Sequence, residues 1–332
     1  MRLSIRGDGP VERAALAAGL GPFPLALAFH GMAAARAVMA GEELGLYARL
    51  ARGPAAAAEL GGAGVEHLLE ALAGLGVLRR DRASRYRLAR RAARWLDPAS
   101  PWCIGDFLKL NRAQWDWWAR LDEVVAGKVP PFDLHRLPPE DPIWPLYGRA
   151  MRVLARIAAP EVARAVKVPR SAARLLDVGG AHGLYAAAIC KRHRGLRAVV
   201  MDLPGAVREA RAVGAPVDFI EGDALAGELP EADVIYCGQL VRHFAPEQVA
   251  ALFARFHRAL ARGGTVNVLD TFSGDGGDPL VALHYHLVSG VARYTADDAG
   301  RWLREAGFRD LRRARVRRLP GATLLSARRA AR

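Results

Sequence analysis

Apolar and polar residues follow a helical spacing in the first part of the chain. Between about residues 27 and 96 this spacing predicts one helix that ends near Gly53, a short one over residues 55–62 and a third over Val65–Leu75. The segment Leu78–Ala89 then alternates as a small hairpin does. Three helices followed by a hairpin indicate a winged-helix domain.

A different pattern begins at Ala173, where short apolar runs alternate with helical runs. Apolar strands that alternate with helices predict a mostly parallel sheet with helices on both faces. The segment Leu311–Arg329 predicts a final antiparallel hairpin, with Pro320 and Gly321 at its turn. The earlier strands are expected over Arg174–Val178, Leu196–Asp202, Val217–Asp223, Ala232–Gly238 and Thr265–Phe272.

A winged helix raises the question of DNA binding, and so does the net charge of +14. The third helix, Val65–Leu75, contains no Lys or Arg and carries Glu66 and Glu70. Since a recognition helix needs donors for bases and phosphates, we predict that this domain dimerises by helix packing instead. We interpret the arginine clusters at Arg79–Arg94 and Arg309–Arg332 as solvated faces, which leaves an anionic small substrate open.

Length and composition favour a two-domain protein of the cytoplasm. A chain of 332 residues exceeds one ordinary domain. No apolar run is long enough to span a bilayer, and the first residues lack the pattern of a secretory signal. The three cysteines are far apart and predict neither a disulfide framework nor a metal site.

The chemistry is expected at the end of the first strand, where the sequence reads D-x-G-G-x-x-G with Asp177, Gly179, Gly180 and Gly183. Ligands of open parallel sheets bind at the carboxyl ends of the strands. Counted from either of the first two glycines, the spacing fails the dinucleotide fingerprint. Bare backbone in this loop allows a close approach to a ligand, and the following helix start favours a ligand carboxylate.

Two further carboxylates end the next two strands and complete the argument for a ligand. Asp202 can accept hydrogen bonds from a pair of ribose hydroxyls, and Asp223 from an adenine amino group. An adenosine that carries an amino-acid end fits all three positions. The sequence therefore predicts a site for S-adenosylmethionine.

Over nearly its whole length the chain resembles the class I methyltransferases, specifically the dimeric small-molecule O-methyltransferases with an N-terminal winged-helix domain. That family includes plant caffeate and hydroxyindole enzymes and bacterial enzymes of natural-product biosynthesis. The matching segments are GEELGLYARLARGP, WARLDEVVAGKVPPF, LYGRAM, LLDVGGAHG, VVMDLPGAV, IEGDAL, ALARGGTVNVLD and RWLREAGF. The resemblance adds Met151, Leu203 and Gly222 to the expected cofactor site.

The resemblance implies a winged-helix dimerisation domain over residues 1–98, a helical inter-domain segment over 99–168 and a Rossmann-like methyltransferase domain over 169–332. The sheet would be mostly parallel, with an antiparallel last strand. S-adenosylmethionine would be the cofactor and S-adenosylhomocysteine its product. The partners would be a small acceptor and a second copy of the chain, with no nucleic acid and no membrane.

The sequence departs from the family at the catalytic base. The position of the usual general-base histidine holds Arg242, and His243 follows it. Arg293 stands where an acidic residue often orients the base. Three interpretations stay open: His243 or a histidine of the LHYHL segment accepts the proton; no base is needed and the two arginines hold an anionic acceptor; or methyl transfer is lost and the protein binds the cofactor for another role.

The acceptor is expected to be a small aromatic or polyketide-like molecule, methylated most often at oxygen. Trp115 and Trp118 predict either core packing or an aromatic wall for a flat substrate. With His284 and Arg293 they form the predicted substrate pocket, beside Met151, Arg242 and His243.

Overall fold

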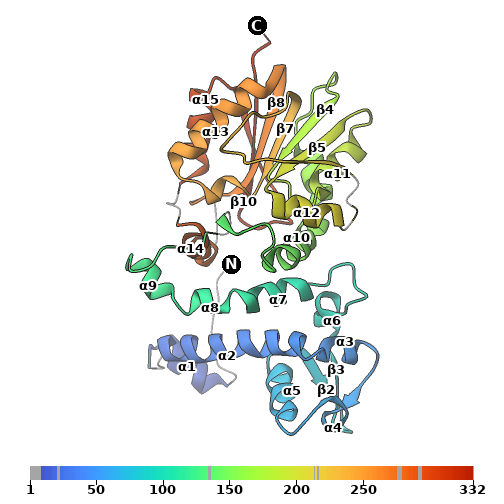
Figure 1. Ribbon diagram of the computed structural model, residues 1–332. Helices are drawn as coiled ribbons and strands as arrows, with labels where there is room; N and C mark the ends of the chain where they lie inside the picture. Colours follow the sequence, from blue (N-terminus) through green and yellow to red (C-terminus); the bar gives the residue numbers. More distant parts are fainter. Residues whose placement is uncertain are drawn as a thin grey trace. The chain divides into compact units, whose positions relative to one another are not determined.

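The computed structural model describes residues 9–20, 23–133, 136–212, 214, 217–274, 279–290 and 294–331. The chain forms two compact units, residues 1–112 and residues 113–332 (Figure 1). No helix of the described residues has both the length and the apolar character needed to cross a membrane.

The first unit combines helices with a small antiparallel sheet of order β1-β3-β2. Leu46, Leu69 and Leu78 are fully buried in its core. The strands are β1 (Ala55–Ala56), β2 (Leu78–Arg80) and β3 (Arg85–Leu88). The helices are α1 (Pro10–Ala17), α2 (Phe23–Glu43), α3 (Leu46–Ala51), α4 (Ala57–Leu60), α5 (Val65–Gly74), α6 (Arg90–Leu96) and α7 (Gly105–Ala113), the last of which reaches the unit boundary.

The sequence prediction of one continuous helix up to Gly53 is wrong. α2 ends at Glu43 and α3 begins at Leu46, because Gly45 adopts a left-handed φ of 66° that breaks the helix. Tyr47 is then buried against α2, where its hydroxyl donates to the carbonyl of Val38 at 2.8 Å. The hairpin of β2 and β3 agrees with the prediction.

The second unit is an α/β domain. Its strands are β4 (Arg174–Val178), β5 (Arg197–Asp202), β6 (Asp218–Glu221), β7 (Ala232–Gly238), β8 (Leu260–Thr271), β9 (Arg309–Arg315) and β10 (Ala322–Arg328). Its helices are α8 (Trp115–Trp118), α9 (Leu121–Val125), α10 (Ile143–Ala165), α11 (Leu184–Arg192), α12 (Pro204–Ala212), the 3-10 turn η2 (Val241–His243), α13 (Pro246–Ala259), α14 (Pro279–Ser289) and α15 (Ala296–Glu305).

The seven-stranded sheet has the order β6-β5-β4-β7-β8-β10-β9. The five strands from β6 to β8 are parallel, whereas β10 pairs antiparallel with both β8 and β9. The fold class predicted from the sequence is confirmed, including the antiparallel end of the sheet. Because β4, β5, β6 and β7 are parallel, their carboxyl ends meet along one edge.

Helices cover both faces of this sheet (Figure 1). On one face, Phe253 of α13 and Leu303 of α15 pack against strand residues such as Val266. On the other face, Val162 of α10 and Ile189 of α11 pack against residues such as Val200. Strands buried on both faces are nearly continuous apolar runs, which is why the sequence marks them clearly.

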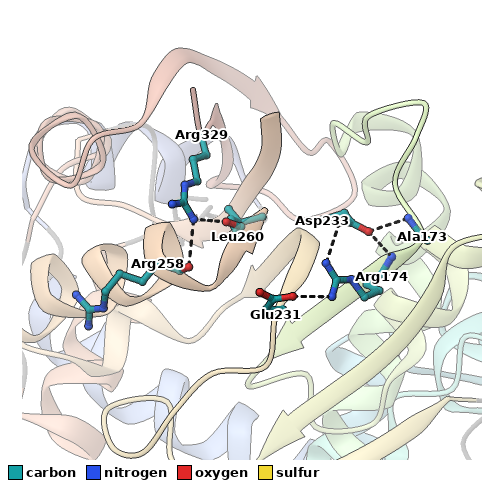
Figure 2. A network of polar contacts seen from close by, with 7 residues as sticks. All are labelled: Ala173, Arg174, Glu231, Asp233, Arg258, Leu260 and Arg329. Carbon is teal, nitrogen blue, oxygen red and sulfur yellow. Dashed lines mark hydrogen bonds and ion pairs between the residues drawn. The ribbon is translucent and has the colours of Figure 1, made fainter. Parts of the chain in front are cut away.

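Polar contacts fasten the opposite, amino-terminal edge of the sheet (Figure 2). The Asp233 carboxylate accepts hydrogen bonds from the backbone N–H groups of Ala173 and Arg174, both at 2.9 Å. Arg329 donates to the carbonyls of Arg258 and Leu260, where α13 gives way to β8. This edge holds the strands together and leaves the carboxyl edge for a site.

Candidate functional site

Two neighbouring cavities lie at the carboxyl ends of β4, β5, β6 and β7. The tyrosine cavity, lined by Tyr147, Tyr185, Tyr236 and Tyr285 among others, has a volume of about 90 Å³. The aspartate cavity, lined by Asp133, Asp202 and Asp223 among others, has a volume of about 460 Å³. Five residues line both of them: Gly179, Asp202, Leu203, Leu240 and His243.

The glycine loop after β4 wraps closely around Asp177. A Cβ atom at Gly180 would lie 2.4 to 2.7 Å from the carboxylate atoms of Asp177, and one at Gly179 would lie 2.7 Å from Leu240. Gly179 also has a φ of 69°, which a side chain would strain. The backbone therefore approaches the cavity where larger residues would fill it.

Asp177 is fully buried and keeps unused hydrogen-bonding capacity. The backbone N–H of Ala186 faces its carboxylate, but neither oxygen completes a hydrogen bond with the described residues. Burial, and then the negative charge of Asp202, raise the pKa of Asp177 to about 8. A buried polar group without a partner costs free energy. This carboxylate therefore favours a ligand that brings a positive charge or hydrogen-bond donors.

Asp202 ends β5 and is held by backbone donors. Its two oxygens accept hydrogen bonds from the N–H groups of Ala181 and Leu203, each at 2.7 Å. Burial raises the pKa of Asp202 to about 6, against the effect of these two bonds. The carboxylate is thus fixed in orientation where the two cavities join.

Asp223 follows β6 and lines the aspartate cavity beside Gly222. One oxygen of Asp223 accepts a hydrogen bond from the N–H of Leu225 at 2.8 Å. The N–H of Gly222 donates to the carbonyl of Asp202 at 2.9 Å, which ties this loop to the end of β5. The structure therefore brings Asp223 to the same edge as Asp177 and Asp202.

Gly183 differs from the other glycines of the loop, because it lines neither cavity. Its φ is 68°, and a Cβ atom there would lie 2.5 Å from Val217. Gly183 therefore lets the start of α11 pack closely on its neighbours.

One face of α10 forms a wall of the tyrosine cavity. Trp144, Tyr147, Met151 and Leu154 all line it, and their spacing places them on one side of a helix. Of these, only Met151 was predicted as a site residue. The indole of Trp144 donates to the carbonyl of Pro138 at 2.9 Å, which fixes the ring. The apolar and aromatic repeat of α10 is a sequence signal that could have identified Trp144 and Tyr147.

Arg242, at the expected base position, is buried and paired inside the protein. Its Nε lies 2.8 Å from Oδ1 of Asp270, and its guanidinium lies 4.3 Å from the ring centre of Tyr285. Burial is the largest single influence and lowers the pKa of Arg242, but the charge of Asp270 together with three nearby tyrosines raises it overall. Arg242 lines neither cavity. Its charge is therefore balanced by Asp270.

His243 lines both cavities. Its Nδ1 lies 2.6 Å from the hydroxyl oxygen of Ser289, at the end of α14. The ring stands nearly perpendicular to that of Tyr285, with 5.0 Å between the ring centres. Contacts on two sides thus fix the imidazole beside the space where a ligand would lie.

The residues predicted for the substrate pocket do not gather at the two cavities. Trp118 stacks on His284 with 5.8 Å between the ring centres, and neither residue lines either of these two cavities. Burial, and then the charge of Arg242, lower the pKa of His284 to about 4, so this imidazole is neutral at pH 7. Trp115 is half-buried and also lines neither cavity, and Arg293 lies outside the described residues.

Comparisons with known proteins point to one family. A family profile described as "O-methyltransferase domain" matches residues 129–309. The tetracenomycin polyketide synthesis 8-O-methyl transferase TcmO of Streptomyces glaucescens is 31% identical over 321 residues, with 88% of this chain and 92% of the relative covered. The N,N-dimethyltransferase OxyT of Streptomyces rimosus is 31% identical over 339 residues, with coverages of 91% and 94%.

A solved structure shares the fold. The human N-acetylserotonin methyltransferase in complex with SAM matches with a TM-score of 0.79 and 22% identity, over 92% of this chain and 96% of that chain.

Proposed function

Because this chain belongs to the O-methyltransferase family, whose members use S-adenosylmethionine, we propose that it methylates an oxygen atom of a small aromatic or polyketide-like acceptor. The polyketide acceptor of the similar Streptomyces glaucescens enzyme supports this substrate class. Trp144 and Tyr147 border the predicted cofactor site and offer aromatic faces on which a flat acceptor could pack.

The described residues fit the cofactor. We propose that Asp177, with Gly179 and Gly180, binds its amino-acid end. The unused oxygens of Asp177 suit an ammonium group, and the two glycines leave room for it. This fit of Asp177 is the observation that carries the proposal.

For the nucleoside, we propose that Asp202 binds the ribose hydroxyls and Asp223 the adenine amino group. Met151, Leu203 and Gly222 would pack around it, and each lines at least one of the two cavities. When bound, the cofactor supplies an electrophilic methyl group. Residues 99–168 would complete the acceptor side of the site through α10.

We propose that His243 accepts the proton of the acceptor hydroxyl. Two observations favour it over an arginine clamp: His243 lines both cavities, and the charge of Arg242 is balanced by Asp270. An Nδ1–H donated to Ser289 would fix the tautomer whose other nitrogen carries the accepting lone pair. His243 would also help to position the acceptor against the methyl group.

The test has two parts. Calorimetric titration with S-adenosylhomocysteine is expected to show binding that Asp202→Ala weakens, and equal heats would exclude the ribose contact. Methyl release from S-adenosylmethionine is then measured on a panel of phenols and hydroxynaphthoates across pH. His243→Ala is expected to lower turnover and flatten the pH profile. His284→Ala is the matched control, because His284 lines neither cavity.

A second candidate function is cofactor binding without methyl transfer. The replacement of the usual base by Arg242, buried against Asp270, favours it. Tight binding of S-adenosylhomocysteine without methyl release on any phenol of the panel would support this candidate against the first.

We also propose that the protein is a cytoplasmic homodimer, joined through residues 1–98. Leu25, Phe29 and Met32 share one face of α2 and are 66%, 60% and 54% exposed. A row of exposed apolar side chains favours burial against a second copy. Light scattering at micromolar concentration is expected to report a dimer that Phe29→Glu dissociates, and a wild-type monomer would exclude it.

A further inference from the structure

The loop between β6 and β7 is held by one arginine from a neighbouring helix. Arg255 of α13 donates from Nη1 to the carbonyl of Leu225 at 2.9 Å and from Nη2 to the carbonyl of Ala226 at 2.8 Å. Nη2 also donates to the carbonyl of Gly227. Three successive carbonyls therefore converge on a single guanidinium, in a loop that contains no helix or strand.

This contact is connected to the aspartate cavity through a single residue. The carbonyl of Leu225 accepts from Arg255, and the N–H of Leu225 donates to the Asp223 carboxylate at 2.8 Å. Leu225 is therefore fixed on both sides, and its N–H sets the direction in which the carboxylate points. A shift of the loop would move Leu225 and release Asp223.

The helix that carries Arg255 is a rigid support. Phe253 and Phe256 of α13 are fully buried in the core under the sheet. Gln248, seven residues before Arg255 and on the same side of the helix, lines the aspartate cavity. One face of α13 thus borders this cavity at Gln248 and holds the loop at Arg255.

We propose that Arg255 is a positioning residue, which orients Asp223 for the adenine end of the cofactor. The inference rests on the proposed function, since it assigns adenine to the aspartate cavity. Ordering a flexible loop costs conformational entropy. A loop that is already fixed by Arg255 avoids this cost when the ligand binds, so the affinity is higher.

The experiment compares two ligands that differ at the adenine amino group. S-adenosylhomocysteine carries this group, and S-inosylhomocysteine has a carbonyl oxygen in its place. Calorimetry gives the ratio of the two dissociation constants, expected to favour the adenosyl ligand about 10-fold in the wild type, as one hydrogen bond would. Global destabilisation would weaken both ligands alike, whereas a displaced Asp223 lowers the ratio.

Arg255→Ala is expected to weaken the binding of S-adenosylhomocysteine about 10-fold and to bring the ratio of the two dissociation constants close to one. Arg255→Gln is measured beside it, so that a folding defect in one variant leaves the other informative. Arg329→Ala is the matched control, because Arg329 is also half-buried and also donates to backbone carbonyls, those of Arg258 in α13 and Leu260 in β8, but at the opposite edge of the sheet (Figure 2). The control should keep both the affinity and the ratio.

An unchanged ratio in folded Arg255→Ala and Arg255→Gln would overturn the role of Arg255 alone. An equal loss of preference in Arg329→Ala would also overturn it, since any loosening of α13 would then suffice. Failure of the wild type to bind S-adenosylhomocysteine would instead overturn the proposed function.

Discussion

Lowering the pH is expected to weaken the binding of S-adenosylhomocysteine, because Asp177 must be ionised to pair with the ammonium group of the ligand. In the ligand-free protein, burial and the charge of Asp202 raise the pKa of Asp177 to about 8. The bound cation favours the carboxylate form. Below this pKa the ligand must first displace a proton, so the apparent affinity falls.

The structure sets the size of the effect. If only ionised Asp177 binds the ammonium group, the apparent dissociation constant grows by the factor 1 + 10^(pKa − pH). With a pKa of about 8, the dissociation constant rises roughly 70-fold between about pH 8.5 and about pH 6, which corresponds to about 2.5 kcal/mol. Asp202, with a pKa of about 6, adds at most a factor of about two, at the lower end of this range.

Calorimetry over this pH range tests the expectation with two controls. Asp177→Asn carries no titrating group at this position, so its affinity should stay flat and should not exceed that of the wild type near pH 6. Adenosine lacks the ammonium group, so its binding to the wild type should vary by no more than the factor of about two that Asp202 contributes. A wild-type profile that is as flat as that of Asp177→Asn would refute the reasoning, and a slope shared with adenosine would assign the effect to another group.

Three further predictions concern stability and shape. Folding raises the pKa of Asp177, so its contribution to stability is complete below the unfolded pKa near 4 and is lost as the pH rises through about 8. Asp177→Asn should therefore raise the free energy of unfolding at pH 8 by about 1–3 kcal/mol. Urea titrations should show this gain at pH 8 and no gain at pH 4. Gly180→Ala should weaken the binding of S-adenosylhomocysteine at least about 10-fold, because the new Cβ would lie 2.4 to 2.7 Å from the Asp177 carboxylate. Unchanged binding heats would show that the loop can move to accommodate the methyl group. Asp270→Asn should cost about 3–5 kcal/mol of unfolding free energy by leaving Arg242 unpaired, and the pair Asp270→Leu with Arg242→Met should cost less; the opposite order would contradict a buried ion pair.

The sequence predicts the fold best where strands are buried on both faces. β4 and β7 begin and end at the predicted residues. β8 instead begins at Leu260, five residues before the predicted Thr265, because the register with β7 shifts between these two residues. Such an irregularity depends on the neighbouring strand, so the spacing of apolar residues along one segment does not reveal it.

The site is predictable to the extent that strand ends determine it. Asp177, Asp202 and Asp223 reach one edge because parallel strands carry them there, and this needs no knowledge of packing. Asp270 also gives a signal in the sequence, since a carboxylate inside an apolar strand needs a buried partner. The stacking of Trp118 on His284 has no such signal, because it depends on how α8 and α14 meet after folding.

The strand order has a consequence for folding during translation. β10 follows β8 and β9 in the sequence, yet it lies between them in the sheet, so both of these have an open edge until residue 328 has emerged. Unpaired edges invite association with other chains. We expect the second unit to remain dependent on chaperones until residue 328 has left the ribosome, and premature stop codons before Ala322 to yield aggregates rather than a smaller enzyme.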